Sequence, residues 1–417
     1  MVNIPKGTKD CLPKDSYKWQ FIENTARSVA KSFGIKEIRT PTFEHTEVFL
    51  RGIGDTTDVV NKEMYTFLDK GNRSITLKPE GTAGVARSFV ENGFASAVMP
   101  LKLYYITPCF RYERPQAGRL REFHQFGIEM FGSNSATIDA EVILMAKTFL
   151  DKVGATGLKL YINSIGCKTC RAEFNQALKD YLKANIGGMC PNCQDRYERN
   201  PLRILDCKED KCKEICANAP KITDYLCDDC KKHFEDLQKY LTLSGVEFAI
   251  NPNIVRGLDY YTKTVFEFVS ENIGAQGTVC GGGRYDGLIA EFGGGQIPGV
   301  GFGLGLERLL LLLESLGVDM NEPVPEVYFA TMGEKEYETA FLLATALRVK
   351  GIDCELDHMG KSLKAQFKYA DKIGAKRVVV IGSSELENGA VTVKNMAEGT
   401  AETVAIDGLV DFFVKTV

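Results

Sequence analysis

The chain has 417 residues, of which 44% are hydrophobic and 25% charged, and its formal net charge at pH 7 is −4. That length is enough for two or three domains with a large core, and the composition is that of a soluble globular protein. The slightly acidic charge excludes a protein that binds nucleic acid over its whole surface, so any such partner must be met by local basic patches.

The sequence carries no signal for export or for membrane insertion. Residues 1–15 are polar and lack the apolar segment of a signal peptide. The longest run of leucines, at 309–313, is far too short to span a bilayer. We therefore expect a cytoplasmic protein that makes no membrane contact.

In the first hundred residues the pattern predicts a helix, an extended stretch and a second helix. Apolar residues recur at helical spacing over 17–33, and Gly34 is a good helix end. The extended stretch over 35–48 contains Pro41, which favours an edge or interface strand. Glu80 stands at a turn that enters a helix over 83–92, where it either stabilises the helix N-terminus or contacts a ligand.

The next predicted element is a hairpin over 110–132, fed by a buried strand over 101–106. Its middle, Pro115 to Gly118, has the residues of a turn. After the turn an alternation with period two predicts a strand with Phe126, Ile128 and Met130 on a core face. The opposite face carries Arg121, Phe123, Gln125, Gly127 and Glu129.

This opposite face is a candidate binding site. Gly127 leaves a bare patch between the amide of Gln125 and the carboxylate of Glu129, which suits a ligand with a positive or hydrogen-bonding group. Arg111, on the first strand, can grip a phosphate with two hydrogen bonds. A surface hairpin with scattered ion pairs would have the same residue types, because charged edge strands are common.

The composition changes after a predicted helix over 139–153 and a strand over 158–163. Nine of the thirteen cysteines fall between Cys167 and Cys230, among charged helical segments. The strand pattern resumes at Val246. Residues 167–245 are therefore predicted to be a helical module inserted into a larger domain.

The spacing of these cysteines predicts zinc binding. Thiols at paired short spacing in a cytosolic protein indicate zinc ligands before disulfides. One plausible group of four comprises Cys167, Cys170, Cys190 and Cys193. The second comprises Cys227 and Cys230 with, in preference to Cys216, the turn-linked Cys207 and Cys212. The pairs can also cross over, since spacing does not decide which pairs share a metal, and a metal-free helical module is the alternative.

Three blocks rich in glycine follow the inserted module: RGLDYYT at 256–262, GGGRYDGL at 281–288 and GVGFGLG at 299–305. Glycine lets a backbone approach a ligand closely. In the third block it clears one strand face, which suits either a flat ligand such as a purine ring or the close packing of another element. The sequence lacks a P-loop and a dinucleotide-binding glycine motif, so arginines and cleared strands would have to hold a nucleotide.

From about Pro325 the pattern alternates strands and helices, at 327–330, 337–350, 353–356, 361–373 and 377–381, and predicts a small α/β domain. A basic stripe at helical spacing comprises Lys361, Lys364, Lys368 and Lys372. Such a stripe suits a phosphate backbone, but it is also typical of a solvated helix face.

Together these segments resemble the histidyl-tRNA synthetases, a family of class II aminoacyl-tRNA synthetases, over nearly the whole chain. The stretch around Pro41 is similar to motif 1, a dimer interface, and FRYERPQAGRLREFHQFGIEMFG at 110–132 is similar to motif 2. GVGFGLGLERLLLLLE at 299–314 is similar to motif 3. These motifs identify only the class, whereas RGLDYYT and GGGRYDGL resemble the two signatures peculiar to the histidine enzyme.

The resemblance implies an α+β protein. A class II antiparallel sheet flanked by helices would form the catalytic domain over 1–325, interrupted by the cysteine-rich helical insertion at 167–245. An α/β anticodon-binding domain would occupy 326–417. The resemblance also implies a homodimer that uses ATP and Mg²⁺ to convert histidine to histidyl-adenylate and then charges the 3′ end of tRNA-His. In the family the inserted domain leans on the tRNA acceptor arm and familiar members hold no metal there, so Zn²⁺ in this chain would be structural.

Site residues follow from the same resemblance. Arg111 would grip the α-phosphate and Arg308 the γ-phosphate, while Mg²⁺ would bridge the departing phosphates. Arg256 would stabilise the charge that develops at the α-phosphate, a role that other class II enzymes give to a metal. Arg119, with Gln116 in the hairpin loop, would face ATP or the tRNA acceptor end. Histidine would be bound by Glu80, Thr82, Gln125, Glu129, Tyr260, Tyr261 and Tyr285.

Two other functions compete with this one. The first is a synthetase-like regulatory subunit of ATP phosphoribosyltransferase that senses histidine without charging tRNA. Such relatives typically lack the C-terminal domain and have eroded histidine signatures, whereas this chain retains both. The second is a nucleotide- or RNA-binding module without catalysis, and the intact set of arginines and carboxylates argues against it.

Overall fold

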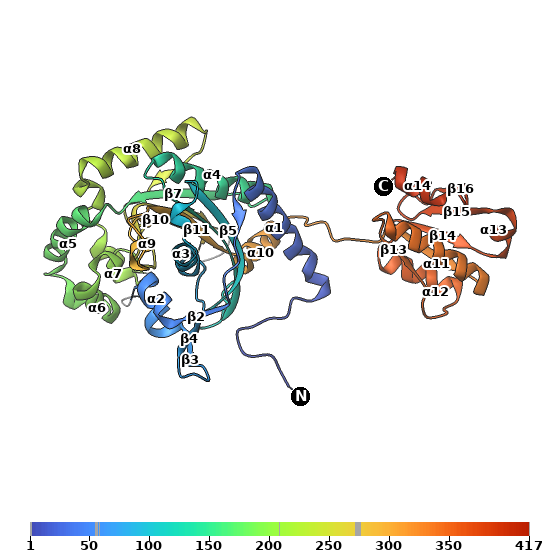
Figure 1. Ribbon diagram of the computed structural model, residues 1–417, viewed down its shortest axis with the longest axis horizontal. Coiled ribbons are helices and arrows are strands. Elements are labelled where there is room, and N and C mark those ends of the chain that lie inside the picture. Colours follow the sequence, from blue (N-terminus) through green and yellow to red (C-terminus); the bar gives the residue numbers. More distant parts are fainter. Residues whose placement is uncertain (1, 55–56, 58, 208, 272–276, 417) are drawn as a thin grey trace. The chain divides into compact units, whose positions relative to one another are not determined.

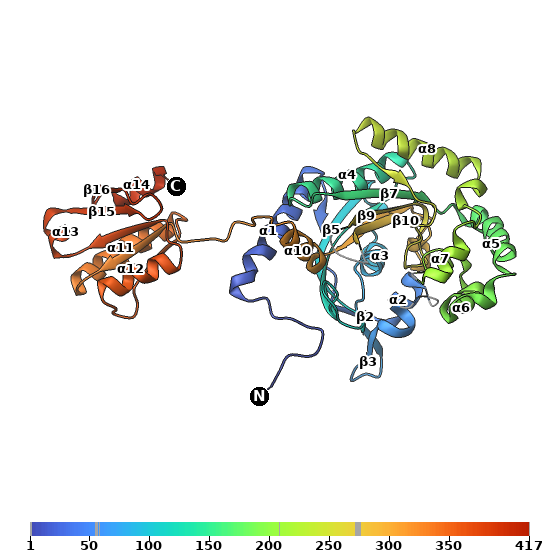
Figure 2. The ribbon, with the colours of Figure 1, turned by 180° about the vertical axis from the view of Figure 1, so that it is seen from behind.

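In the computed structural model the chain forms two compact units, Met1–Met320 and Asn321–Val417. The structure describes residues 2–54, 57, 59–207, 209–271 and 277–416. Figures 1 and 2 show opposite sides of the ribbon. Among the described residues, no helix is both long enough and apolar enough to cross a bilayer.

An eight-stranded sheet forms the centre of the first unit, in the order β1-β5-β6-β11-β10-β9-β7-β8. Its central pairs, from β5 to β7, are antiparallel, while β1 joins β5 and β8 joins β7 in parallel. The bounds are β1 (Lys36–Glu37), β5 (Leu101–Phe110), β6 (Glu122–Phe131), β7 (Leu158–Ser164), β8 (Ala249–Ile250), β9 (Thr262–Ser270), β10 (Thr278–Arg284) and β11 (Gly299–Gly305). The predicted antiparallel sheet flanked by helices is thus confirmed.

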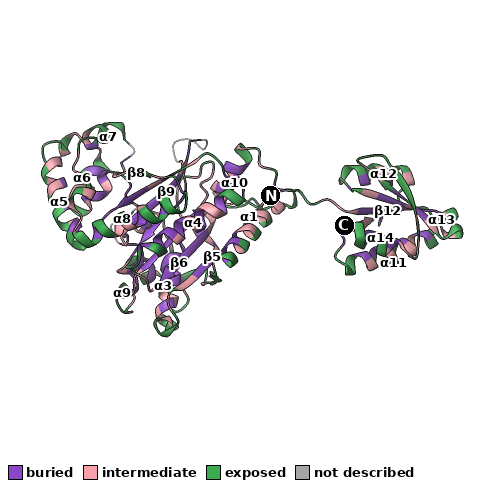
Figure 3. Ribbon diagram, turned by 90° about the horizontal axis from the view of Figure 1, so that it is seen from above, coloured by how far each residue is buried: buried purple, intermediate pink, exposed green. Residues whose placement is uncertain are grey.

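The two faces of this sheet are covered differently. One face packs the predicted core residues Phe126, Ile128 and Met130 against α1 (Pro13–Ser32), α4 (Ala136–Lys152), α8 (Asp228–Leu243) and α10 (Leu306–Ser315). The other face packs against α3 (Thr82–Glu91) and the short α9 (Leu288–Glu291). Figure 1 shows α3 lying over this sheet, and in Figure 3 the strands β5 and β6 are mostly buried. The alternation read from the sequence of β6 therefore matches its two environments.

Residues 35–48 differ from the extended stretch that the sequence predicts. β1 ends at Glu37, and β2 (Phe43–His45) belongs to a separate three-stranded sheet. Helix α2 (Thr46–Ile53) begins directly after β2. That small sheet has the order β2-β4-β3, with β3 (Tyr65–Leu68) and β4 (Ser74–Leu77), and a π-helical segment (Val59–Glu63) lies before β3 in the chain. The helix forms because Val48, Phe49 and Ile53 bury one apolar face at helical spacing, a pattern that the prediction of an extended stretch missed.

The cysteine-rich segment folds into short helices, as predicted, and is coloured green in Figure 1. These are α5 (Lys168–Leu182), α6 (Pro191–Arg199) and α7 (Asp210–Cys216), with 3-10 turns at Ile186–Gly188, Pro201–Ile204 and Ile222–Tyr225. They enclose a small core of their own around Phe174, Leu178 and Leu182. The following helix α8 differs, because Leu237 and Leu241 pack into the main core beside α4.

The second unit is a five-stranded mixed sheet in the order β13-β12-β14-β15-β16, covered by helices. Its strands are β12 (Val327–Thr331), β13 (Cys354–Leu356), β14 (Arg377–Ile381), β15 (Ala390–Asn395) and β16 (Ala401–Ala405). Its helices are α11 (Glu334–Val349), α12 (Leu363–Lys372), α13 (Ser383–Asn388) and α14 (Leu409–Thr416). The predicted α/β pattern is confirmed up to β14, while the β15–β16 hairpin was not predicted. The lysines of the basic stripe are exposed on and just before α12.

Candidate functional site

A buried carboxylate lies at the centre of the sheet face under α3. Glu129, on β6, is fully buried and accepts hydrogen bonds from Thr82 Oγ1 at 2.7 Å, from Tyr105 OH at 3.1 Å and from Tyr285 OH. Burial raises the pKa of Glu129 to about 8, although the hydroxyls of Tyr285 and Thr82 oppose this shift. A carboxyl group that titrates near neutral pH and is surrounded by hydroxyls is suited to recognising a polar, ionisable ligand.

The bare patch predicted at Gly127 is not open, and the sequence-based expectation is wrong on this point. The ring of Tyr105, from the neighbouring strand β5, lies over it: a Cβ placed on Gly127 would be 2.3 Å from the ring, and one placed on Gly81 would be 2.2 Å from it. Tyr105 was missed as a site residue. The register of β5 and β6 pairs it directly with Gly127, and cross-strand neighbours cannot be read from one strand alone.

Several glycines of β10 and β11 lie against side chains of the site in the same way, and some of these also lie against the backbone of a neighbouring strand. A Cβ on Gly301 would lie 2.2 Å from Glu129 Oε2, and one on Gly303 would lie 2.5 Å from Gln125 Nε2. The corresponding contacts elsewhere are Gly299 with the Tyr285 ring, Gly281 with the Arg256 guanidinium and Gly283 with the Tyr261 ring. At Gly299, Gly301 and Gly303 the glycine therefore allows close packing of other residues and does not leave space for a flat ligand.

Glu80 serves the helix end that the sequence suggested. Its carboxylate accepts hydrogen bonds from the backbone N–H groups of Thr82 at 2.7 Å and Ala83 at 2.8 Å, at the first turn of α3. The side chain is only 2% exposed, and burial raises its pKa. Gln125 joins the same turn, because its Oε1 accepts from the Gly81 N–H at 2.9 Å. Four of the seven residues assigned to histidine thus form one polar cluster with Tyr105.

The remaining three form an aromatic wall next to this cluster. The rings of Tyr260 and Tyr261 have centroids 4.6 Å apart, and Tyr285 contacts Tyr260 edge-on at 5.5 Å. Tyr261 and Tyr285 are buried. Burial raises the pKa of Tyr261, so its hydroxyl stays protonated at neutral pH and is available as a hydrogen-bond donor.

A cavity of about 770 Å³ opens beside the polar cluster and is lined by arginines. Arg111 Nε donates to the Pro79 carbonyl at 2.8 Å, which fixes the guanidinium at the cavity wall. Burial together with the positive charges of Arg119 and Arg111 lowers the pKa of Arg308. Three cations held this close indicate a site for an anion with several charges, such as a polyphosphate.

Arg256 lines the same cavity on the side of β10. It forms an ion pair with Glu267, whose other oxygen accepts a hydrogen bond from Thr278 Oγ1 at 2.9 Å. Its buried Nε–H has no hydrogen-bond partner among the described residues. A buried donor without a partner costs about 1–3 kcal/mol, so the group is poised for an acceptor that the cavity would hold.

The hairpin tip lies apart from this group. The turn at Ala117–Gly118 was predicted, and the Gln116 and Arg119 backbones form a bridge across it. Arg119 pairs with Glu113 at 2.7 Å and reaches the arginine-lined cavity. Gln116 is exposed and lines a different hollow of about 470 Å³. Of the predicted nucleotide residues, Gln116 is therefore the one that does not line the main cavity.

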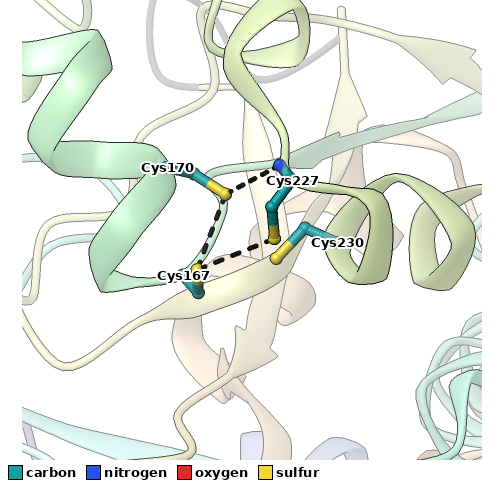
Figure 4. Close-up of side chains that lie close together, drawn as sticks. All are labelled: Cys167, Cys170, Cys227 and Cys230. Atoms are coloured by element: carbon teal, nitrogen blue, oxygen red, sulfur yellow. Dashed lines mark hydrogen bonds between the residues drawn. The ribbon is translucent and has the colours of Figure 1, made fainter.

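The cysteines form two groups of four, with a pairing that corrects the favoured one. Cys167 and Cys170 meet Cys227 and Cys230, while Cys190 and Cys193 meet Cys207 and Cys212. Figure 4 shows the first group, which joins the start of α5 to the start of α8. The favoured pairing failed because α6 and α7 fold back on one another within the insertion and bring the middle four sulfurs together, which leaves the two ends to meet. This is the crossed arrangement that the spacing left open.

The geometry within each group is that of ligands around a single ion. All four sulfurs of a group lie within 4.8 Å of one another, with Cys167 to Cys170 at 3.5 Å and Cys190 to Cys207 at 3.8 Å. A disulfide would need about 2.05 Å, whereas tetrahedral zinc–thiolate bonds of about 2.3 Å place the sulfurs roughly 3.8 Å apart. Both groups can hold a metal ion.

The geometry so far defines a class of protein: an antiparallel-sheet enzyme domain whose one face joins a polyanion cavity to a buried polar pocket. A family model described as histidyl-tRNA synthetase matches residues 7–181 and 203–309, and one described as an anticodon binding domain matches 326–416. The chain belongs to the histidyl-tRNA synthetase family.

Full-length relatives agree with this assignment. The chain is 56% identical to the histidine–tRNA ligase of Caldanaerobacter subterraneus, with 98% of each chain covered. It is also 56% identical to that of Acetivibrio thermocellus, with 98% of this chain and 99% of the relative covered. The crystal structure of apo S. aureus histidyl-tRNA synthetase is similar with a TM-score of 0.84 at 42% identity, covering 99% of this chain and 100% of that one.

Proposed function

We propose that the protein is a histidine–tRNA ligase, which activates histidine with ATP and transfers it to the 3′ end of tRNA-His. The observation that carries this proposal is the junction between the buried polar cluster around Glu129 and the arginine-lined cavity, within a chain of this family. A regulatory subunit without charging activity is less supported, because the two relatives described above, each 56% identical over nearly its whole length, are histidine–tRNA ligases.

The first step joins histidine to AMP. The histidine carboxylate attacks the α-phosphorus of ATP, the bond to the bridging oxygen breaks, and pyrophosphate leaves. Arg111 and Arg256 stand on opposite sides of the cavity and would bind the α-phosphate, with the unpartnered Nε–H of Arg256 meeting the charge that develops there. Arg308 and Arg119 would bind the outer phosphates. In the second step the terminal ribose hydroxyl of tRNA attacks the acyl carbon and AMP leaves.

Mg²⁺ would enter this cavity with ATP. It prefers oxygen ligands and is usually held by one or two carboxylates together with phosphates. Four carboxylates line the cavity, those of Glu113, Asp206, Glu267 and Glu307, so the residues fit the ion. When bound, Mg²⁺ would neutralise charge on the departing pyrophosphate. The protein's own part is to keep these carboxylates oriented, as Glu307 is by the His124 backbone N–H at 2.9 Å.

Histidine would be selected by the buried cluster. Glu129, Tyr261 and Tyr285 would surround the imidazole, and Glu80 and Gln125 would receive the α-amino group, with Thr82 and Tyr260 completing the wall. A pocket that hydrogen-bonds both imidazole nitrogens rejects an analogue that lacks them, because its own buried groups would be left unpaired. Specificity of this kind needs no separate editing domain.

The domain assignment follows from the same proposal. Residues 1–325 form the catalytic domain, interrupted at 167–245 by the insertion, and 326–417 bind the anticodon of tRNA-His, where the exposed lysines of α12 would meet the phosphate backbone. Gln116, exposed at the hairpin tip, would meet the acceptor end. Because tRNA and ATP are its substrates, we place the enzyme in the cytoplasm.

We also propose a homodimer. The small sheet after Pro41 exposes large apolar side chains, with Phe43 at 56%, Phe67 at 48% and Leu68 at 67%. Neighbouring exposed apolar residues of this kind are typical of a surface that a partner covers. The stretch around Pro41 is also the one that resembles the family's dimer interface.

Two structural zinc ions would complete the inserted segment, one in each group of four cysteines. The distances between sulfurs fit, and backbone N–H groups already donate to sulfur: Cys227 N to Cys170 Sγ at 3.1 Å and Cys190 N to Cys212 Sγ at 3.3 Å. Such donors stabilise thiolate ligands. Elemental analysis of protein purified without chelator tests this: about two equivalents are expected, and a small fraction of one equivalent would refute it.

The ligase itself is tested by exchange of labelled pyrophosphate into ATP. Exchange should depend on histidine among the amino acids and should be largely lost in Arg256→Ala, since that variant removes the guanidinium whose buried Nε–H would meet the charge developing at the α-phosphate. An exposed control, Arg73→Ala, should leave exchange unchanged, because Arg73 lies in the β3–β4 turn, where it pairs with the nearby Asp69. A folded protein without any histidine-dependent exchange would contradict the proposal.

A further inference from the structure

The inserted segment contributes hydrogen bonds to the loop that carries Arg256, in addition to those from β7 and from Ile53. Residues 251–261 join β8 to β9 and have no strand pairing of their own. Asn200 Nδ2 donates to Asp259 Oδ1 at 2.8 Å, and Arg203 Nη1 donates to the Gly257 carbonyl at 3.0 Å. Arg171 Nη1 donates to the Tyr261 carbonyl at 3.2 Å. Three side chains of the insertion thus contact three consecutive parts of this loop.

Each of these donors lies next to a group of four cysteines. Arg171 directly follows Cys170, in the first turn of α5. Asn200 and Arg203 lie in the stretch between Cys193 and Cys207, two members of the second group. Asp206 of this stretch and Arg256 of the loop line the same cavity. The positions of the sulfurs therefore set the positions of the donors.

The stretch between Cys193 and Cys207 has little regular secondary structure, although Leu202, Ile204 and Leu205 pack into the core of the insertion. It contains the end of α6, which has 9 residues, and a 3-10 turn of 4 residues, and it is followed by α7 with 7 residues. Helices shorter than about 12 residues are marginal without tertiary support. Fixing Cys193 and Cys207 to one ion closes the stretch into a loop and lowers the entropy lost when its donors are ordered.

We propose that the two zinc-thiolate groups act as positioning elements for Arg256, because they fix the donors that hold the loop over 256–261 beside the cavity. This inference rests on the proposed ligase function and on the proposed zinc. Arg171, Asn200 and Arg203 are then positioning residues, and loss of either metal loosens the loop while the eight-stranded sheet stays folded. The second group, with Cys190, Cys193, Cys207 and Cys212, holds two of the three donors and has the larger effect.

The first test removes a donor and leaves the metal in place. Asn200→Ala should retain both zinc ions and show roughly tenfold faster hydrogen exchange in the peptide over 256–261, the fold-change expected from one charged-group hydrogen bond. Asn185→Ala is the matched control: it truncates an exposed amide of the same segment that makes no side-chain hydrogen bond within the described part of the chain. If Asn200→Ala and Asn185→Ala leave exchange at 256–261 equally unchanged, the proposed positioning is overturned.

The second test removes the metal. Cys212→Ser should lose one zinc and accelerate exchange at 256–261, while Cys216→Ser, a buried cysteine of α7 outside both groups, should keep two zinc ions and the wild-type exchange. Strands β6 and β11 should stay protected in both variants. Loss of zinc from Cys212→Ser without any change at 256–261 would refute the coupling.

Pyrophosphate exchange separates this inference from the proposal on which it rests. With a working ligase, kcat for exchange should fall roughly tenfold in Asn200→Ala and Cys212→Ser, with KM for histidine changed less, because Arg256 acts on the developing charge. A wild type that turns over no histidine, but whose loop still responds to the variants, would refute the ligase and leave the coupling standing. Unchanged turnover with a loosened loop would instead refute the role in positioning Arg256.

Discussion

The buried carboxyl group of Glu129 makes the stability of the first unit depend on pH. In the folded protein its pKa is raised from 4.5 to about 8, chiefly by burial and in part by the nearby Glu80 carboxylate. Between these two values the folded state keeps a proton that the unfolded state releases. Stability is therefore fully present below pH 4.5 and falls as the pH rises toward 8.

The size of this effect follows from the shift. Each pKa unit corresponds to about 1.4 kcal/mol. When the titration of Glu129 in the folded and unfolded states is included, the free energy of unfolding falls by roughly 2.5 kcal/mol between pH 5 and pH 7. Glu129→Gln removes the titration but retains a side chain of the same shape. The free energy of unfolding of wild type relative to Glu129→Gln should therefore fall by about that amount from pH 5 to pH 7.

Urea unfolding followed by tryptophan fluorescence measures this difference for the first compact unit, which contains Glu129. Trp19 is the only tryptophan of the chain and packs against the core of the first unit. Glu173→Gln, at an exposed position of α5, is the control and should run parallel to wild type. If Glu129→Gln also runs parallel to wild type across this range, the carboxyl group is ionised in the folded protein and the reasoning is refuted.

Other predictions follow from glycines, a buried ion pair and the metal groups. On β11, a Cβ at Gly305 has open space, so Gly305→Ala should be neutral. Gly303→Ala should raise KM for histidine roughly tenfold by displacing the Gln125 amide. Gly301→Ala should lower Tm, since its Cβ would lie 2.0 Å from a backbone oxygen. Equal Tm values for all three variants would contradict the predicted loss of stability in Gly301→Ala. Asp139→Ala should cost about 3–5 kcal/mol, because it leaves the fully buried guanidinium of Arg284 without its main partner; a loss under 1 kcal/mol in urea unfolding would argue against it. Strong chelators should remove zinc and increase proteolysis within 167–226 before the sheet unfolds. If the inserted segment and the sheet instead unfolded together, this would count against a local role of the metal.

Much of the fold could be predicted because it depends on local periodicity. The alternation of β6 and the helical spacing of α1, α3 and α4 report which face is buried, and the structure agrees with them. The prediction failed at 46–48, where the predicted extended stretch runs into the start of helix α2, because three residues are too few to show a helical period. The β15–β16 hairpin was missed as well.

The candidate site was predicted in its parts and not in its arrangement. The arginines and carboxylates came from motifs, and the structure brings most of them to one face of the sheet. Tyr105 was missed because its role depends on pairing with Gly127 across two strands. The same holds for Asn200, whose amide reaches a loop 59 residues away in the chain.

By itself the sequence determined the fold class, the family and the chemical groups available, because these depend on residue types at short spacing. The tertiary structure alone decided which side chains meet. It decided that Tyr105 covers the glycine patch, that the cysteine pairs cross over, and that the insertion holds the Arg256 loop. Such contacts depend on strand register and on how short helices fold back, which are set by packing over long sequence separations and leave no local signal in the chain.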